Sequence, residues 1–274
     1  MKLLRSRSLF SFFLIAGAVL VSACETVHTT QGGVVGVDRQ QRMLVSSQEL
    51  EQTASKQYTT LIAAEKKQNE VNRDPAQVAR VRRITDRLIA QTPVFRPDAR
   101  NWKWEVNVLT SDEVNAWCMP GGKIAVYTGL IDKLKVTDDE LAAVLGHEIA
   151  HALREHARER VSEQMAYGSA ISVGAALLGI GDLGQQGAQY AYKGLVGLPN
   201  SRAHETEADR IGVELAARAG YDPRAAVTLW QKMARTGGGE PLTFLSTHPS
   251  SADRSNDLTD YSQRVMPLYQ QARK

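Results

Sequence analysis

The stretch TDDELAAVLGHEIAHAL, residues 137–153, carries the clearest structural signal in the chain. Thr137 followed three residues later by Glu140 forms a capping box, and the acidic first turn suits the positive end of a helix dipole. The rest of the stretch is apolar on nearly every side, which predicts a helix buried in the core. We expect the charged residues that follow to carry the end of this helix into water; they are Arg154, Glu155, Arg158, Glu159 and Arg160.

Two histidines and a glutamate interrupt this apolar helix. His147 and His151 are four residues apart, so they project from one face one turn apart, where two imidazoles can bind a single metal ion. Glu148 lies beside them and can reach a water molecule at that metal. The alternative is a pair of solvated histidines on a surface helix, but unpaired polar side chains in a buried segment are costly. The motif therefore predicts a metal site with a glutamate as general base.

A third metal ligand is predicted in the stretch SRAHETEADRIG, residues 201–212. Ser201 can cap a helix that begins here. On this helix Glu205 falls on the apolar stripe and faces inward, whereas Glu207 falls on the opposite, solvent side. An inward carboxylate needs a cation, and Asp209, one turn further on, can orient a ligand histidine from behind. A structural pair between glutamate and arginine is the alternative.

Around these two helices the sequence predicts an α+β fold that is mainly α-helical and contains a small β-sheet. Helical periodicity marks the helices, and alternation of apolar and polar residues marks the strands. The other expected helices cover residues 46–72, 75–91, 128–134, 223–235 and 253–264, with a further turn after Pro267. The expected strands cover residues 104–110, 116–119 and 123–127. The last two strands form a hairpin, because Pro120-Gly121-Gly122 between them is a turn.

The first 23 residues have the pattern of an export signal. Basic residues precede the apolar stretch from Leu9 to Leu20, which is too short to span a bilayer. The ending Val21-Ser22-Ala23-Cys24 resembles a bacterial lipobox, in which residues 1–23 are removed and Cys24 is lipidated. By the same resemblance Glu25 favours the outer membrane over the inner one, since lipoproteins with aspartate at that position are usually kept in the inner membrane.

The remaining chain divides into a linker and a domain. Residues 24–45 lack helical periodicity and are rich in small and polar residues, so we expect a flexible tether between the lipid and a metallopeptidase domain at 46–274. Removing residues 1–23 leaves 30 basic and 30 acidic side chains. This balance gives no basic field for nucleic acid, so no nucleic-acid partner is expected.

Three other features carry weaker signals. The apolar stretch 168–181 is too short to cross a membrane, so we expect a core or hairpin helix; a lid, or a surface that dips into the membrane or holds apolar substrate, is the alternative. Cys118 is expected to be a small buried residue, with a redox-sensitive thiol or an intermolecular disulfide as the alternative. Three histidines lie outside the motifs and are expected to be exposed or locally hydrogen-bonded: His28, His156 and His204.

Three motifs together resemble a known family. The sequences HEIAH at 147–151, SRAHETEAD at 201–209 and STHPSSADR at 246–254 follow the order and spacing found in gluzincin metallopeptidases. That family includes CAAX prenyl proteases and HtpX-like heat-shock proteases, and the chain is most similar to its periplasmic lipoproteins of the BepA/LoiP type. The resemblance spans residues 75–262 and implies a zincin-like (minigluzincin) fold with the small sheet beside the HExxH helix. It also implies one Zn²⁺ per chain, with Glu205 as third ligand.

The resemblance assigns roles to residues that carry little signal alone. It implies that His248 and Arg254 stabilise the oxyanion of the reacting carbonyl, and in BepA-like members the histidine can also cap the zinc. The stretch NAWCMPGGKIAVYTGL, residues 115–130, resembles the strand beside which the family's substrate lies. The corresponding substrate-strand residues are Asn115, Ala116 and Trp117. Cys118 departs from the family, which more often has a small or apolar residue there.

The sequence thus predicts a zinc-dependent endopeptidase of the bacterial cell envelope, lipid-anchored on the periplasmic side. Zinc-activated water, with Glu148 as general base, is expected to cleave unfolded or misassembled envelope proteins. The alternative is an envelope chaperone or assembly factor for outer-membrane proteins, with latent or minor protease activity and the outer-membrane protein assembly machinery as partner. A scaffold that works without zinc is a third hypothesis.

Overall fold

The computed structural model describes residues 25–166, 195, 197–236, 242–249 and 253–274. The predicted export signal, the lipobox cysteine Cys24 and the apolar stretch 168–181 lie outside these residues. Within the described ranges, no helix is long and apolar enough to cross a membrane. The fold is α+β and mainly helical, as the sequence predicts.

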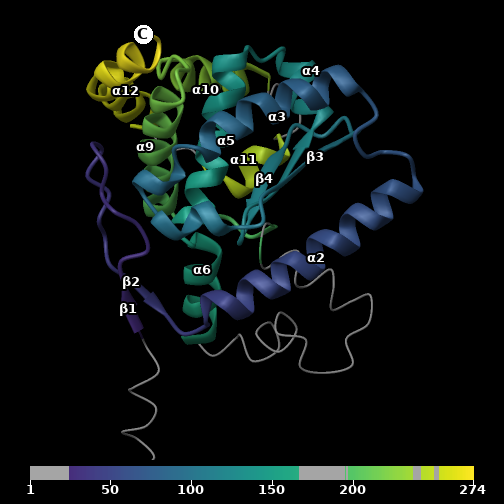
Figure 1. Cartoon of the computed structure of the whole chain (residues 1–274), viewed down its shortest axis with the longest axis horizontal. Helices are drawn as coiled ribbons and strands as arrows, with labels where there is room; N and C mark the ends of the chain where they lie inside the picture. The colour runs from purple at the N-terminus through teal and green to yellow at the C-terminus, as the bar shows by residue number, and fades with distance from the viewer. Residues whose placement is uncertain (1–24, 167–194, 196, 237–241, 250–252) are drawn as a thin grey trace, which may run out of the picture.

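Helices surround a small sheet (Figure 1). The described helices are α2 (Ser47–Lys67), α3 (Pro75–Ile89), α4 (Thr128–Leu134), α5 (Asp138–Leu153), α6 (His156–Ala166), α9 (Arg202–Arg218), α10 (Ala225–Thr236), α11 (Thr243–Thr247) and α12 (Arg254–Ala272), with the 3-10 helices η1 (Thr92–Val94) and η2 (Pro97–Asn101). The described strands are β1 (Glu25–Val27), β2 (Gln41–Met43), β3 (Glu105–Leu109), β4 (Ala116–Met119) and β5 (Lys123–Tyr127).

The main sheet has the order β3-β5-β4, with β3 parallel to β5 and the predicted β4–β5 hairpin antiparallel. Alternate residues of β4 and β5 point to opposite faces. One face packs against α2, where Tyr58 meets Trp117, and the other packs against α3 and α5. Because both faces are covered, every residue of β4 and β5 is buried. Among the described strands, β4 lies at the edge of this sheet.

The helix predicted to be buried, α5, lies at the centre of the molecule (Figure 1) and packs against β4, α3, α9 and α10. Its capping box is present, since the Glu140 N–H donates to Thr137 Oγ1 at 3.2 Å and the Thr137 N–H donates to Glu140 Oε2 at 2.8 Å. Every residue from Glu140 to Leu153 is buried. The sequence therefore predicted the start and the environment of this helix correctly.

The prediction that α5 continues into water is wrong. The helix is capped at Arg154, Glu155 takes a left-handed conformation with φ 52°, and α6 begins at the next residue in a new direction. The charged residues at this junction pair with one another and with neighbouring segments, which offsets the cost of their burial. The buried set is Arg154, Glu155, Arg158, Glu159 and Arg160.

Residues 25–45 are not a flexible tether. β1 pairs antiparallel with β2, β2 packs against α6, and Val35 and Val37 are buried in the main core. The segment is also held by polar contacts, because the backbone N–H of Val35 donates to Glu214 Oε2 at 2.9 Å and Gln41 Nε2 donates to the Arg154 carbonyl at 2.8 Å. Too few apolar residues mark this segment for periodicity to reveal its packing.

The end of the chain also differs from the prediction. α12 is continuous through Pro267, where a separate turn was expected. A proline in a helix removes one hydrogen bond to the carbonyl four residues earlier. Here Pro267 and Gln263 are exposed, so water can satisfy that carbonyl, while Val265 stays buried in the core.

Candidate metal centre

The site forms where α5 and α9 cross at an unusually short distance. A Cβ atom on Gly212 would lie only 2.7 Å from the His147 backbone nitrogen, and one on Gly146 would lie 2.8 Å from the Gly212 carbonyl oxygen. Glycine at both positions lets the two backbones touch. This contact brings the inward face of α9, with Glu205 and Asp209, against the histidine face of α5.

Four buried side chains converge here, with ligand atoms that all lie within 4.8 Å of one another: His147, His151, Glu205 and His248. The Nε2 atoms of the two α5 histidines are 3.0 Å apart. Glu205 places Oε2 3.5 Å from His147 Nε2 and Oε1 3.3 Å from His151 Nε2. The three residues predicted as ligands thus lie together, and Glu205 faces inward as the apolar stripe indicates.

These residues fit a divalent metal ion such as Zn²⁺. Two imidazole nitrogens and one carboxylate make up one of the known ligand sets of catalytic zinc. Glu205 Oε2 is buried and accepts no hydrogen bond from any described residue. The Nε2 atoms of His147 and His151 point toward each other, so their lone pairs would repel unless a cation or a proton lay between them. A metal held by His147, His151 and Glu205 would satisfy all of these atoms.

Glu148 lies next to the ligands and faces a small pocket. The pocket has a volume of about 30 Å³ and is lined by residues that include Trp117, Cys118, Glu148, His151 and His248. Burial raises the pKa of Glu148 above its ordinary value, although His248 and His147 act in the opposite direction. A carboxylate with a raised pKa in a pocket is a suitable general base. Burial also raises the pKa of Cys118 well above its ordinary value, so that side chain is a neutral thiol.

Asp209 and Arg254 lie behind the ligands. His147 Nδ1 is 2.9 Å from Asp209 Oδ1, which orients the ring and leaves Nε2 free for a metal. Arg254 Nη2 donates to the same carboxylate oxygen at 2.7 Å, and Nη1 lies 3.1 Å from Glu205 Oε2. The guanidinium carbon sits 3.3 Å from the centre of the Trp230 ring. Asp209 therefore lies behind a ligand histidine, as the sequence predicts, and Arg254 contacts the carboxylates of both Glu205 and Asp209 on α9.

His248 lies among the ligands. Its Nδ1 is 3.0 Å from Glu205 Oε1 and 3.2 Å from His147 Nε2, and its Nε2 is 3.4 Å from Glu148 Oε1. The ring stacks on Phe244, with centroids 4.3 Å apart. In this position His248 can serve either as a fourth ligand or as a hydrogen-bond donor to a reacting group.

The predicted substrate strand borders the same site at Trp117. β4 contacts α5, and Trp117 and Cys118 line the pocket that holds Glu148. Asn115 precedes the strand, where its Oδ1 accepts from the Ala116 N–H at 2.9 Å and its Nδ2 donates to Glu113 at 2.9 Å. These bonds shape the start of β4, so the asparagine acts on the strand through its local geometry.

A comparison with protein families agrees with this arrangement. The model of peptidase family M48 matches residues 75–262, which contain every residue of the candidate metal centre. The chain belongs to peptidase family M48. The resemblance to gluzincin metallopeptidases that the motifs indicate is therefore confirmed.

Individual M48 relatives come from mitochondria and from bacteria. The chain is 38% identical over 183 residues to mitochondrial metalloendopeptidase OMA1 of Schizosaccharomyces pombe, a match that covers 66% of this chain and 52% of that relative. It is 34% identical over 156 residues to metalloprotease LoiP of Escherichia coli, covering 56% and 60%. It is 27% identical over 205 residues to the beta-barrel assembly-enhancing protease of Yersinia pestis, covering 71% and 40%. The chain spans about half the length of the curated relatives it matches.

The M48 chain also holds a buried polar cluster that the sequence did not predict. His156 and His204 are fully or almost fully buried, at 0% and 2% exposure, and Glu207 is buried where solvent was expected. His156 Nε2 lies 3.1 Å from Glu207 Oε2, and the guanidinium of Arg154 neutralises the same carboxylate. The available signal was the charge complementarity between REHARER, residues 154–160, and HETE, residues 204–207.

Proposed function

We propose that this protein is a zinc-dependent endopeptidase of the bacterial cell envelope that cleaves unfolded or misassembled envelope proteins. The observation that carries this proposal is the convergence of His147, His151 and Glu205, with Glu148 beside them in a pocket. When bound, zinc supplies Lewis-acid activation of water and of the scissile carbonyl at neutral pH. The alternative, a structural pair between Glu205 and an arginine, is present in part, because Arg254 Nη1 lies 3.1 Å from Glu205 Oε2. Such a pair does not explain why two histidines also converge on this carboxylate.

The chain's own side chains can carry the proton and the charge. Glu148 would accept a proton from the attacking water and deliver it to the leaving amine, a role to which its raised pKa is suited. Asp209 holds the proton on His147 Nδ1 and so fixes the ring. Arg254 keeps a buried Nε donor without a hydrogen-bond partner among the described residues, and together with His248 it would stabilise the oxyanion.

The sheet supports a substrate bound in an extended conformation. β4 is an edge strand whose residues line the pocket beside Glu148. A peptide added along such an edge is held by backbone hydrogen bonds, which tolerate many sequences. This mode of binding favours unfolded or misassembled chains over one fixed sequence. The substrate strand would run from Asn115 through Ala116 and Trp117.

The envelope location rests on the sequence of the first 25 residues. The lipobox pattern implies lipidation of Cys24, attachment to the periplasmic face and, from Glu25, the outer membrane. Labelled palmitate should be incorporated into the full-length protein and not into Cys24→Ala when both are expressed in a bacterium. Equal labelling of the two proteins, or none, would refute lipidation at this residue.

An assembly role for outer-membrane proteins is the second candidate function. One bacterial relative is named a beta-barrel assembly-enhancing protease, and His248 stands close enough to the ligands to close the remaining metal position. Both observations favour a latent protease that binds envelope proteins and the outer-membrane assembly machinery. If this is the main function, Glu148→Gln should still complement an envelope defect of a deletion strain, whereas loss of complementation favours proteolysis.

The direct test of the endopeptidase uses the purified protein and unfolded casein. Cleavage should occur with one zinc ion per chain, stop when a chelator removes the metal, and return when zinc is restored. Zinc content should be measured on the same samples. Cleavage that persists in metal-free protein would refute the proposal, as would a protein that folds but binds no zinc.

A further inference from the structure

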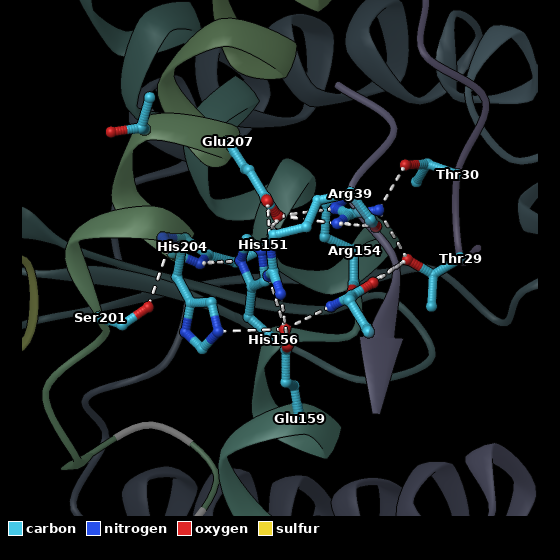
Figure 2. Close-up of polar contacts among 12 residues, drawn as sticks. Thr29, Thr30, Arg39, His151, Arg154, His156, Glu159, Ser201, His204 and Glu207 are labelled. Atoms are coloured by element: carbon cyan, nitrogen blue, oxygen red, sulfur yellow. Dashed lines mark hydrogen bonds and ion pairs between the residues drawn. The ribbon is translucent and has the colours of Figure 1, made fainter. Parts of the chain in front are cut away.

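Behind His151 the described residues form a buried polar cluster that the proposed function does not use. It contains two histidines, two carboxylates and two guanidinium groups, contributed by the C-cap of α5, α6, α9 and the N-terminal segment (Figure 2). Figure 2 shows the cluster between α9, in green, and the N-terminal segment, in purple. Its closest approach to the metal centre is the 2.7 Å contact between His151 Nδ1 and His156 Nδ1.

This contact depends on the break between α5 and α6. In an uninterrupted helix, residues five apart lie about 140° apart around the axis and about 7.5 Å apart along it, so two such side chains cannot meet end to end. Glu155, with φ 52°, interrupts the helix between His151 and His156. Its carboxylate is held by Arg96 Nη1 at 2.9 Å and Arg158 Nη1 at 2.7 Å. These ion pairs stabilise a backbone conformation that is unfavourable for a residue with a side chain.

The donor and acceptor in the His151–His156 and His156–Glu207 contacts follow from the single N–H that a neutral imidazole carries. His151 turns Nε2 toward Glu205 and His147. A neutral imidazole that gives Nε2 to a metal must carry its proton on Nδ1. His151 Nδ1 is therefore the donor in the contact with His156, and His156 Nδ1 must be the acceptor. The proton of His156 then lies on Nε2, which is 3.1 Å from Glu207 Oε2 and can donate to it.

We propose that His156, anchored by Glu207, is a positioning residue for the metal ligand His151 and fixes the tautomer in which His151 binds metal. The inference rests on the proposed function, because it requires His151 to be a ligand. His147 is oriented directly by the carboxylate of Asp209 at 2.9 Å. The second histidine ligand, His151, is instead oriented by the carboxylate of Glu207 through the imidazole of His156.

The outer end of this chain of hydrogen bonds is held by two arginines. Arg154, which is fully buried, places Nε and Nη2 each 2.9 Å from Glu207 Oε2. Arg39 pairs with both Glu207 and Glu159, and it belongs to the segment between β1 and β2. The N-terminal segment, expected to be a tether, thus contacts Glu207, which supports His151 through His156.

The same cluster is unsuited to a second metal ion, although His156, Glu159 and His204 place ligand atoms within 4.8 Å of one another. The carboxylate of Glu159 already accepts from Arg39 Nη1 at 2.6 Å and from His204 Nε2 at 3.1 Å. A divalent cation beside the guanidiniums of Arg39 and Arg154 would be repelled by both. The cluster is therefore not a second metal site, and the part of it that supports His151 is the His156–Glu207 pair.

The test measures zinc affinity in the full-length protein, by competition with a chromogenic chelator at fixed pH. His156→Phe keeps a planar aromatic ring and removes the acceptor, so the zinc dissociation constant should rise about 10- to 100-fold. His156→Asn keeps an amide oxygen close to the position of Nδ1 and should lose less affinity. His204→Phe is the matched control, because His204 is equally buried and stacks on His156 without contacting His151.

A second measurement needs no variant. Long-range ¹H–¹⁵N correlation spectra of the zinc-loaded, histidine-labelled protein should show His151 protonated on Nδ1 and His156 protonated on Nε2. A proton on His156 Nδ1 would overturn the inference, as would a His156→Phe protein that binds zinc as tightly as the wild type. If the wild-type protein itself binds no zinc, the proposed function fails first, so the two failures can be told apart.

Discussion

The close crossing of α5 and α9 predicts that Gly212→Ala damages the metal site more than the fold. The added Cβ would lie 2.7 Å from the His147 nitrogen and 2.9 Å from the Gly146 carbonyl carbon. Non-bonded heavy atoms prefer about 3.5–4.0 Å, so α9 must move away from α5 by roughly 0.8 Å or more. Glu205 and Asp209 are carried by α9 and would move with it.

The magnitudes separate the effect on stability from the effect on metal binding. Alanine favours a helix over glycine by about 1 kcal/mol, whereas overpacking typically costs about 1–3 kcal/mol. The net loss of unfolding free energy should therefore be only about 0–2 kcal/mol. Functional sites tolerate displacements of about 0.5 Å, so the ligands would be out of position, and we expect zinc affinity to fall at least about tenfold.

The assay compares zinc affinity by chelator competition with thermal unfolding of the metal-free protein. Gly32→Ala is the control, because a Cβ there would meet nothing closer than 3.5 Å and the residue belongs to neither α5 nor α9. The control should retain wild-type affinity. If Gly212→Ala binds zinc as tightly as the wild type, the contact between the two glycines does not set the position of the ligands, and the reasoning is refuted.

Three further predictions follow from the site and its supports. Asp209→Asn should weaken zinc binding about 10- to 100-fold in the same competition assay, because His147 loses its carboxylate partner; an unchanged constant would contradict this role. Zinc at about 100 times its dissociation constant should stabilise the protein by about 2.7 kcal/mol, so calorimetry should show a rise of several degrees in Tm that a chelator abolishes. Although burial opposes its charge, hydrogen bonds from Lys232, Thr137 and Thr228 lower the pKa of Glu140, so its stabilising effect is present at neutral pH and is lost as pH falls through the folded-state pKa. The Tm difference between wild type and Glu140→Gln should therefore shrink between about pH 5 and pH 3; a constant difference would show that the charge of Glu140 is unimportant.

The parts of the fold that the sequence predicts correctly carry strong local signals. The capping box at Thr137, the Asp74-Pro75 helix start and the hairpin turn before β5 each depend on a few neighbouring residues. The inward position of Glu205 follows from helical periodicity alone, since its neighbours on the stripe are apolar. In each case local and tertiary preferences agree, so the local pattern is sufficient.

The errors concern charged residues whose partners are distant in sequence. Arg154 and Glu207 were assigned to solvent, and His156 was expected to be exposed or locally hydrogen-bonded, yet all three are buried and pair with one another. Periodicity cannot distinguish a solvated charge from one whose partner lies 53 residues away, as between Arg154 and Glu207. The packing of residues 25–45 against the domain was missed for a related reason, because Arg39 pairs with Glu159 and Glu207 on other elements.

The central claim is tested most directly by Glu148→Gln, assayed on unfolded casein with zinc content measured on the same preparation. The amide cannot accept the proton of the attacking water, while His147, His151 and Glu205 still hold the metal. We predict one zinc ion per chain and no detectable cleavage. A variant that keeps its zinc and cleaves casein at the wild-type rate would contradict the account.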